Sequence, residues 1–297
     1  MALHSEMINI LLVIIATGGV FLTFRAFEKW GVDRFTAIVI NYGVASGLGW
    51  TLAGGVPMMK ASYEMPWFFV TAIMGAGFLY LFNLMAKCTA ELGVAVSSIA
   101  SKLSLVIPVA IFLIIDPNDT LSPLKAIALL LAVIAIMLSS RGDDSKHPSN
   151  SNWSFLLPII IFIGSGAIDL IFAWYSSPLF VPNPQYAMAF TAVPFSVAFI
   201  LGVIIWTYRN GVRKAPASKD LLAGILLGVV NFGSLFFLLG AYGIQDIDKS
   251  VMIPGVNIGV ILFSTIGAVV IYKDSPSKIT WAGLAIGLVS IIILMIA

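Results

Sequence analysis

The stretch VAVSSIASKLSLVIPVAIFLII, residues 94–115, decides how the rest of the sequence is interpreted. It is apolar and long enough to cross the roughly 30 Å hydrocarbon core of a bilayer as a helix. Yet Lys102 stands near its middle, where a lysine costs about 2.5 to 3.5 kcal/mol on insertion scales. The stretch therefore predicts a membrane helix whose lysine faces water or a polar partner.

The whole chain shares this apolar character. Of its 297 residues, 60% are hydrophobic and 10% are charged, whereas soluble domains carry about 25% charged residues. This composition predicts an integral membrane protein. The net charge of +2 is spread over short loops and does not indicate a nucleic-acid partner. One cysteine and two histidines leave no internal disulfide and no His/Cys cluster, so we expect neither a metal nor another cofactor.

Runs of about 20 mainly apolar residues recur along the chain, as transmembrane helices require. Ten such runs lie near 7–27, 34–54, 65–86, 92–115, 121–139, 154–175, 185–208, 219–241, 249–272 and 279–296. None shows the strict alternation of a membrane β-barrel strand. The sequence therefore predicts an all-α integral membrane protein with ten transmembrane helices.

The runs fall into two sets of five, separated by the long polar break at 139–150. We expect a first five-helix repeat at 1–140, a polar linker at 141–152 and a second repeat at 153–297. Three similarities occur in the same order in both halves: 17–27 with 164–174, 86–96 with 241–251, and 121–140 with 279–295. Because five is odd, the second repeat enters the membrane from the opposite face, which predicts inverted repeats around a central cavity.

The chain resembles the ten-helix, EamA-like branch of the drug/metabolite transporter superfamily. The resemblance rests on the Gly-rich first run, the hairpin FNLMAKCTAELGVAVSSIASKLSLVIPV with Pro108, and FFLLGAYGIQDIDKSVMIPGVNIGVILFSTIGAVVIYKD in the second half. Asp116 and Asp274 end the corresponding runs. Two features depart from the pattern, namely the early position of Pro254 and the presence of Lys102. The resemblance implies a proton- or exchange-driven carrier of small metabolites, with the fifth run of each repeat at the periphery.

Lys102 is the first candidate site residue. At the offset of 155 that aligns the two hairpins, it corresponds to Asn257, so both halves place a polar side chain near mid-membrane. Ser98 lies four residues earlier on the same helical face. The amine can bind an anionic group or exchange protons, since ionisable residues in spans are usually functional. The alternative is a buried lysine, with nearby serines, that only holds helices together.

Asp169 is the second charge inside a run, and we expect it to couple transport to protons. Its position suggests that it lies roughly 8 Å deeper than Lys102, so a direct pair between them is not favoured. Pairing with Lys249 is the alternative. Glu91 and Asp246 occupy equivalent places in the two repeats and are candidate gate charges, although solvation is the usual explanation for charges at loop edges.

Polar residues in other runs are candidates to line the cavity and contact substrate. These residues are Tyr80 and Asn83 in the third run, Asn41 and Tyr42 in the second, and Asn231 in the eighth. An amide in hydrocarbon needs a hydrogen-bond partner, which makes the asparagines the stronger candidates.

The sequence thus favours a secondary active transporter, an exporter or exchanger of a small metabolite such as an amino acid or an aromatic compound. The chain has no G-x-x-x-x-G-K-[ST] motif, so ATP is not its direct fuel. Two alternatives stay open: an intramembrane enzyme with a Ser98/Lys102 dyad, and a channel or lipid scramblase. We expect a multi-pass protein of a cell membrane, the plasma or inner membrane of a bacterium. A monomer and a homodimer both fit the sequence.

Overall fold

The structure is a computed structural model that describes residues 2–115, 122–139, 155–179, 184–211, 215–242 and 249–296. The helices are α1 (Ala2–Trp30), α2 (Arg34–Ala53), α3 (Val56–Ser62), α4 (Phe68–Leu92), α5 (Val94–Leu103), α6 (Val106–Ile115), α7 (Pro123–Ser139), α8 (Leu156–Leu179), α9 (Pro184–Asn210), α10 (Ser218–Tyr242), α11 (Lys249–Gly267) and α12 (Lys278–Ile296). A π-helical turn, Ala268–Tyr272, continues α11.

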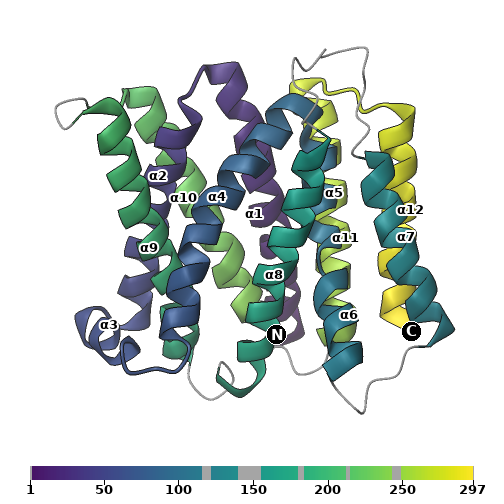
Figure 1. Cartoon of the computed structure of the whole chain (residues 1–297), viewed down its shortest axis with the longest axis horizontal. Coiled ribbons are helices and arrows are strands. Elements are labelled where there is room, and N and C mark those ends of the chain that lie inside the picture. Colours follow the sequence, from purple (N-terminus) through teal and green to yellow (C-terminus); the bar gives the residue numbers. More distant parts are fainter. Residues whose placement is uncertain are drawn as a thin grey trace. The chain divides into compact units, whose positions relative to one another are not determined.

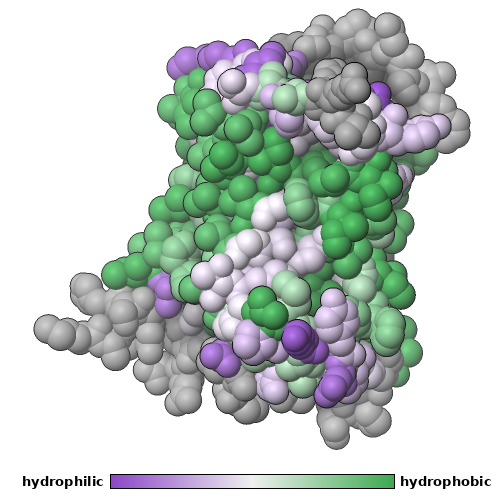
Figure 2. All heavy atoms as spheres, turned by 90° about the vertical axis from the view of Figure 1, so that its left-hand side faces the viewer, coloured by the Kyte–Doolittle hydropathy of each residue, from purple (hydrophilic) through white to green (hydrophobic). Residues whose placement is uncertain are grey.

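The prediction of an all-helical membrane protein is confirmed. Eight helical segments within the described ranges are long and apolar enough to cross a bilayer, and the described residues contain no strand. Two further apolar helices, Pro123–Leu138 and Leu156–Phe172, are shorter. On the face shown in Figure 2, hydrophobic side chains form a broad green band and hydrophilic ones gather at its two ends. This pattern is typical of a surface that contacts lipid tails.

Two details of the helices differ from the prediction. The short helix α3 follows α2 after Gly54 and Gly55, whose φ angles of 109° and 72° are readily adopted only by glycine. The fourth apolar run is not one helix, because it is divided into α5 and α6 at Ser104 and Leu105.

The chain forms two compact units, each built from segments of both halves of the sequence. Unit 1 comprises residues 1–83 and 174–243, and unit 2 comprises residues 84–173 and 244–297. Helices α4 and α8 each contribute to both units. These units reflect packing, and the division of the sequence into repeats at 1–140 and 153–297 stays a prediction.

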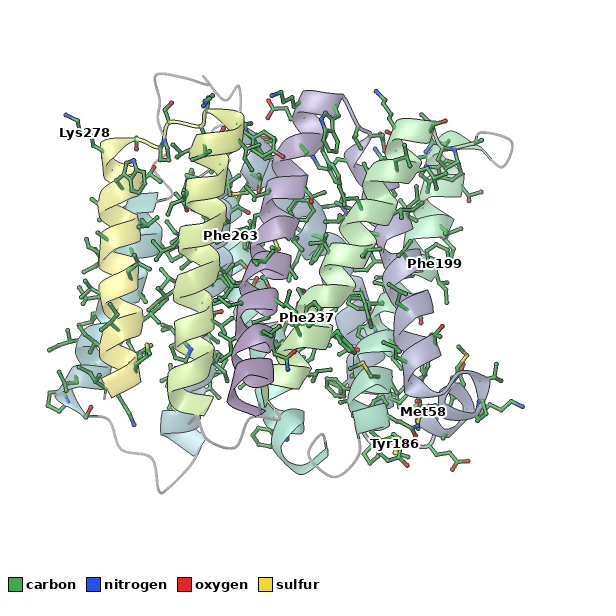
Figure 3. The ribbon with its side chains drawn as sticks, turned by 180° about the vertical axis from the view of Figure 1, so that it is seen from behind. Met58, Tyr186, Phe199, Phe237, Phe263 and Lys278 are labelled. Carbon is green, nitrogen blue, oxygen red and sulfur yellow. The ribbon has the colours of Figure 1, made fainter. Side chains whose placement is uncertain are left out.

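In unit 1, α2 packs against both α9 and α10 (Figure 1). Trp206 Nε1 of α9 donates to Thr36 Oγ1 near the start of α2 at 2.9 Å. Trp50 Nε1, near the end of α2, donates to Ser196 Oγ of α9 at 2.8 Å. Between them, the Phe199 ring lies against Gly43 (Figure 3). Because the start of one helix meets the end of the other, α2 and α9 run antiparallel.

In unit 2, α12 packs along α7, and α11 packs against α5 (Figure 1). Ser290 Oγ of α12 donates to the Ala128 carbonyl of α7 at 2.7 Å. The Leu103 side chain of α5 lies against Gly287 of α12. Small residues and serine hydroxyls thus join these helices, as is usual where hydrophobicity alone cannot hold helices together in lipid.

Candidate functional site

The break between α5 and α6 is the centre of the candidate site in unit 2. Pro108 has no N–H to donate to the Ser104 carbonyl four residues earlier, and its ring crowds that carbonyl. The Ser104 carbonyl instead accepts from Ile107 N at 2.9 Å, which closes a tighter turn. The helix therefore ends one residue after Lys102 and restarts at Val106.

Lys102 and Asn257, which the sequence alignment of the two halves pairs, are brought together at this break. Asn257 Nδ2 of α11 donates to the backbone carbonyl of Lys102 at 3.3 Å. Both side chains are half-buried. The bond reaches the last turn of α5, where helix carbonyls need partners from outside the helix. Asn257 therefore stabilises the break through the backbone of Lys102, and this bond does not use the ammonium group.

Asp169 of α8 lies at the same break. Its Oδ2 lies 2.7 Å from Ser104 Oγ, within hydrogen-bond distance, and its side chain is near enough to Lys102 for the two charges to interact. The expected difference in depth of roughly 8 Å between Asp169 and Lys102 stays a prediction. The expected depths assumed one continuous helix from residue 92, whereas α5 begins at Val94 and ends before Ser104. No ion pair within 4.0 Å joins the two side chains in the described part of unit 2.

Gly166, one turn before Asp169, allows α8 to approach the break. A Cβ atom there would lie 2.4 Å from Cδ1 of Ile107 and 2.8 Å from its Cβ. Such distances are far shorter than an ordinary contact, so only glycine fits without displacing α8 or α6. The Gly166 position thus fixes how closely Asp169 reaches Ser104.

The serines before Lys102 form local bonds. Ser98 Oγ donates to the Ala95 carbonyl at 3.1 Å, and Ser97 Oγ donates to the Met85 carbonyl of α4 at 3.2 Å. Both serines are fully buried. These bonds agree with the alternative stated for the serines near Lys102, which is that they only hold helices together.

The candidate asparagines of unit 1 and Tyr42 each make a hydrogen bond within that unit. Asn231 Nδ2 of α10 donates to Asn41 Oδ1 of α2 at 3.1 Å, and both side chains are buried. The buried Tyr42 hydroxyl donates to the Phe78 carbonyl of α4 at 2.7 Å. Asn83 Nδ2 donates to the Leu79 carbonyl one turn earlier at 2.7 Å. The amide pair therefore stabilises the contact between α2 and α10.

Tyr80 and the gate candidates stand apart from these groups. The Tyr80 side chain is exposed, and no described contact joins it to another site residue. Glu91 forms an ion pair of 3.8 Å with Lys87 on the same helix. Asp246 lies outside the described residues, as does the Lys249 side chain, so the structure describes neither a paired gate nor the alternative partner of Asp169.

Ser104 is the residue that the sequence did not single out as a site. Ser104 is one of the serines near Lys102 for which the sequence predicts only a packing role, yet its hydroxyl contacts Asp169 directly. The pattern that could have identified it is its position four residues before Pro108, where a broken helix exposes polar backbone groups. No group of three or more His, Cys, Asp and Glu side chains suited to a metal ion occurs among the described residues.

Comparisons with known proteins agree with the fold and with the resemblance to a transporter family. Residues 180–296 match the model of the EamA-like transporter family. An uncharacterized protein of Haemophilus influenzae is 29% identical over 213 residues, which cover 71% of this chain and 69% of that protein. A solved crystal structure matches with a TM-score of 0.53 and 15% identity, over 95% of this chain and 96% of the other. At that identity the match shows the fold alone. The resemblance to the drug/metabolite transporter superfamily is confirmed by the EamA-like domain.

Proposed function

We propose that this multi-pass membrane protein, which carries an EamA-like transporter domain, is a secondary active transporter of a small metabolite. It works by alternating access as an exporter or exchanger, and movement of the metabolite is coupled to protons. The substrate class is a small amphipathic compound, such as an amino acid or an aromatic metabolite. The protein acts in a cell membrane, the plasma or inner membrane of a bacterium, as a monomer or homodimer.

The helix pairings support an inverted repeat as the basis of this mechanism. In each unit, a helix from the first half of the sequence packs against its counterpart from the second half: α2 with α9, α5 with α11, and α7 with α12. The α2 and α9 contacts run antiparallel, with a tryptophan near the end of each helix bonded to the other. Antiparallel counterparts are expected when two repeats have opposite orientations in the membrane. Alternating access uses such repeats as moving parts.

The single observation that carries the proposal is the convergence of Lys102, Asp169 and Asn257 on one broken helix. Broken helices are typical of substrate and ion sites in secondary transporters, because their polar backbone groups are available to a ligand. A lysine or an aspartate inside a membrane span lowers stability, so their presence there is expected to serve a function. In the proposed cycle, Asp169 takes up and releases the proton, and Lys102 binds substrate.

The intramembrane enzyme is the weaker alternative. A Ser98/Lys102 dyad requires the serine to give its proton to the lysine amine. Ser98 Oγ instead donates to the Ala95 carbonyl within its own helix, so its proton points away from that chemistry. A channel or scramblase would need a continuous polar path through several helices, and the sequence shows no such stripe.

Transport by purified protein in proteoliposomes tests the proposal. Uptake and counterflow are measured for a panel of amino acids and aromatic metabolites, each with and without an imposed pH gradient. We expect saturable counterflow for at least one class and faster net flux with the gradient. If protein of verified fold gives no saturable flux for any compound under either condition, the carrier function is wrong. Flux that rises linearly with concentration would favour a channel instead.

A further inference from the structure

The Ser104 hydroxyl has two partners and one proton. It lies within hydrogen-bond distance of the Ser101 carbonyl, in the last turn of α5, and 2.7 Å from Asp169 Oδ2. A hydroxyl donates one hydrogen bond, and a carbonyl or an ionised carboxylate only accepts. If the hydroxyl donates to Ser101, the hydrogen between Ser104 and Asp169 must come from the carboxyl group. Two full hydrogen bonds therefore form together only when Asp169 carries a proton on Oδ2, because otherwise the single hydrogen of Ser104 is shared between two acceptors.

We propose that Ser104 is the positioning residue of the proton site, which holds protonated Asp169 against the α5–α6 break and changes partner when Asp169 ionises. The proposal deepens the proton coupling proposed above and rests on that function. In the protonated state, Asp169 donates to Ser104 and Ser104 donates to the Ser101 carbonyl. When the proton leaves to water, the Ser104 O–H turns to the carboxylate, because a charge-assisted bond is the stronger of the two.

The change of hydrogen-bond partner by Ser104 affects the end of α5 because Ser101 and Ser104 are both buried. Ser104 is fully buried and Ser101 is nearly so, which leaves little water to take over a lost bond. When Ser104 turns to Asp169, the Ser101 carbonyl loses a partner at the end of α5, where helix carbonyls already lack intrahelical donors. The protonation of Asp169 is thereby transmitted to the end of the helix that carries Lys102.

The charged neighbour in this exchange is Lys102. Within the described part of unit 2, it is the side chain whose charge acts on Asp169, while α11 presents the neutral amide of Asn257 to the same turn. Loss of the proton leaves a carboxylate beside an ammonium group, which strengthens their attraction. Ser104 thus determines whether Asp169 is held as a neutral acid at the break or as an anion facing Lys102.

Infrared difference spectroscopy of the purified full chain in lipid nanodiscs tests this proposal without a substrate. The carbonyl stretch of a protonated carboxyl group is recorded across a pH titration, and Asp169→Asn identifies the band that belongs to Asp169. We expect this band in the wild type. In Ser104→Ala the band moves in frequency, and the pH midpoint of its loss shifts by about one unit, the equivalent of one charge-assisted hydrogen bond. Ser104→Thr keeps the hydroxyl and restores the wild-type band.

Ser264→Ala is the matched control. Ser264 is fully buried in α11 and donates to the Ile261 carbonyl three residues earlier, as Ser104 does to Ser101, but it does not contact Asp169. Its substitution leaves the Asp169 band unchanged. If Ser104→Ala does not fold, Ser104→Cys keeps the volume with a weaker donor and shifts the midpoint in the same sense by less.

Two results would overturn the proposal. If no carboxyl band is lost in Asp169→Asn, Asp169 does not hold a proton, and the assignment of a proton to its Oδ2 is wrong. If the band is present but Ser104→Ala leaves its frequency and midpoint as in the wild type, Ser104 does not position it. Neither result depends on flux, so both are distinguishable from a failure of the carrier function, which the transport panel measures.

Discussion

Gly228→Ala should destabilise the contact between α2 and α10 in unit 1. A Cβ atom at Gly228 would lie 2.8 Å from the Asn41 carbonyl oxygen and 2.7 Å from Cβ of Val44. Ordinary contacts begin near 3.4 Å, so the helices must separate by about 0.6 Å at this point. Gly224, one turn earlier, makes an equally close approach to Ala37 and Ile40. Separation at one glycine therefore strains the other.

The buried amide pair sets the size of the effect. The Asn231 to Asn41 distance of 3.1 Å, lengthened by the required separation, exceeds the 3.5 Å limit of a hydrogen bond. Losing that bond costs about 0.6 to 1.7 kcal/mol inside a membrane protein, and overpacking adds about 1 to 3 kcal/mol. Replacing glycine by alanine in a helix returns about 1 kcal/mol. The net loss in unfolding free energy is about 0.6 to 3.7 kcal/mol.

Unfolding free energies from steric trapping in bicelles provide the measurement. Gly47→Ala is the matched control, because Gly47 lies on α2 and a Cβ atom there meets nothing within 4 Å. That variant should be neutral or more stable by up to about 1 kcal/mol. If Gly228→Ala proves as stable as Gly47→Ala, the close approach of α2 and α10 is not a tight contact and the reasoning fails.

Three further predictions concern the break and the packing serines. Pro108→Ala restores an N–H donor for the Ser104 carbonyl. Thermal unfolding should then occur at the same or a higher temperature, while flux falls about tenfold or more. Unchanged flux would show that transport does not need the helix break. Asp169→Asn should abolish the acceleration by a pH gradient but retain counterflow, measured in proteoliposomes, and a retained acceleration would remove Asp169 from coupling. Ser196→Ala leaves the Trp50 N–H and the Ser46 hydroxyl without their shared partner. It should lower the unfolding free energy by about 1 to 3 kcal/mol. A loss below about 0.3 kcal/mol would show that water replaces the serine.

Much of the fold could be predicted from the sequence, because a membrane imposes simple rules on helix length and apolarity. The described helices follow the predicted apolar runs, but only eight segments within the described ranges are long and apolar enough to cross a bilayer. The fourth run is divided at Ser104, and helix α3 was not predicted. Helix breaks are harder to predict, because a proline can bend a membrane helix without ending it. Pro194 and Pro254 lie inside continuous helices, whereas α5 ends before Pro108.

The candidate site was predictable where symmetry applied. Aligning the repeats paired Lys102 with Asn257, and the structure brings their helices into contact. The contact of Asp169 with Ser104 was not predictable from the sequence, because it depends on Gly166 and on where α5 ends. The role of Ser104 depended on the same local geometry. Interactions between elements distant in sequence, such as Asn41 with Asn231, required the structure as well.

Counterflow by Lys102→Met is the most direct test of the account. Methionine keeps the length of the lysine side chain but cannot bind an anionic group or exchange a proton. Lys60→Met, at an exposed lysine of α3, controls for the substitution itself. For the substrate identified by the panel, we predict saturable counterflow in the wild type and Lys60→Met, and a loss of at least about tenfold in a stably folded Lys102→Met. Unchanged counterflow in folded Lys102→Met would contradict the central claim that transport depends on this lysine.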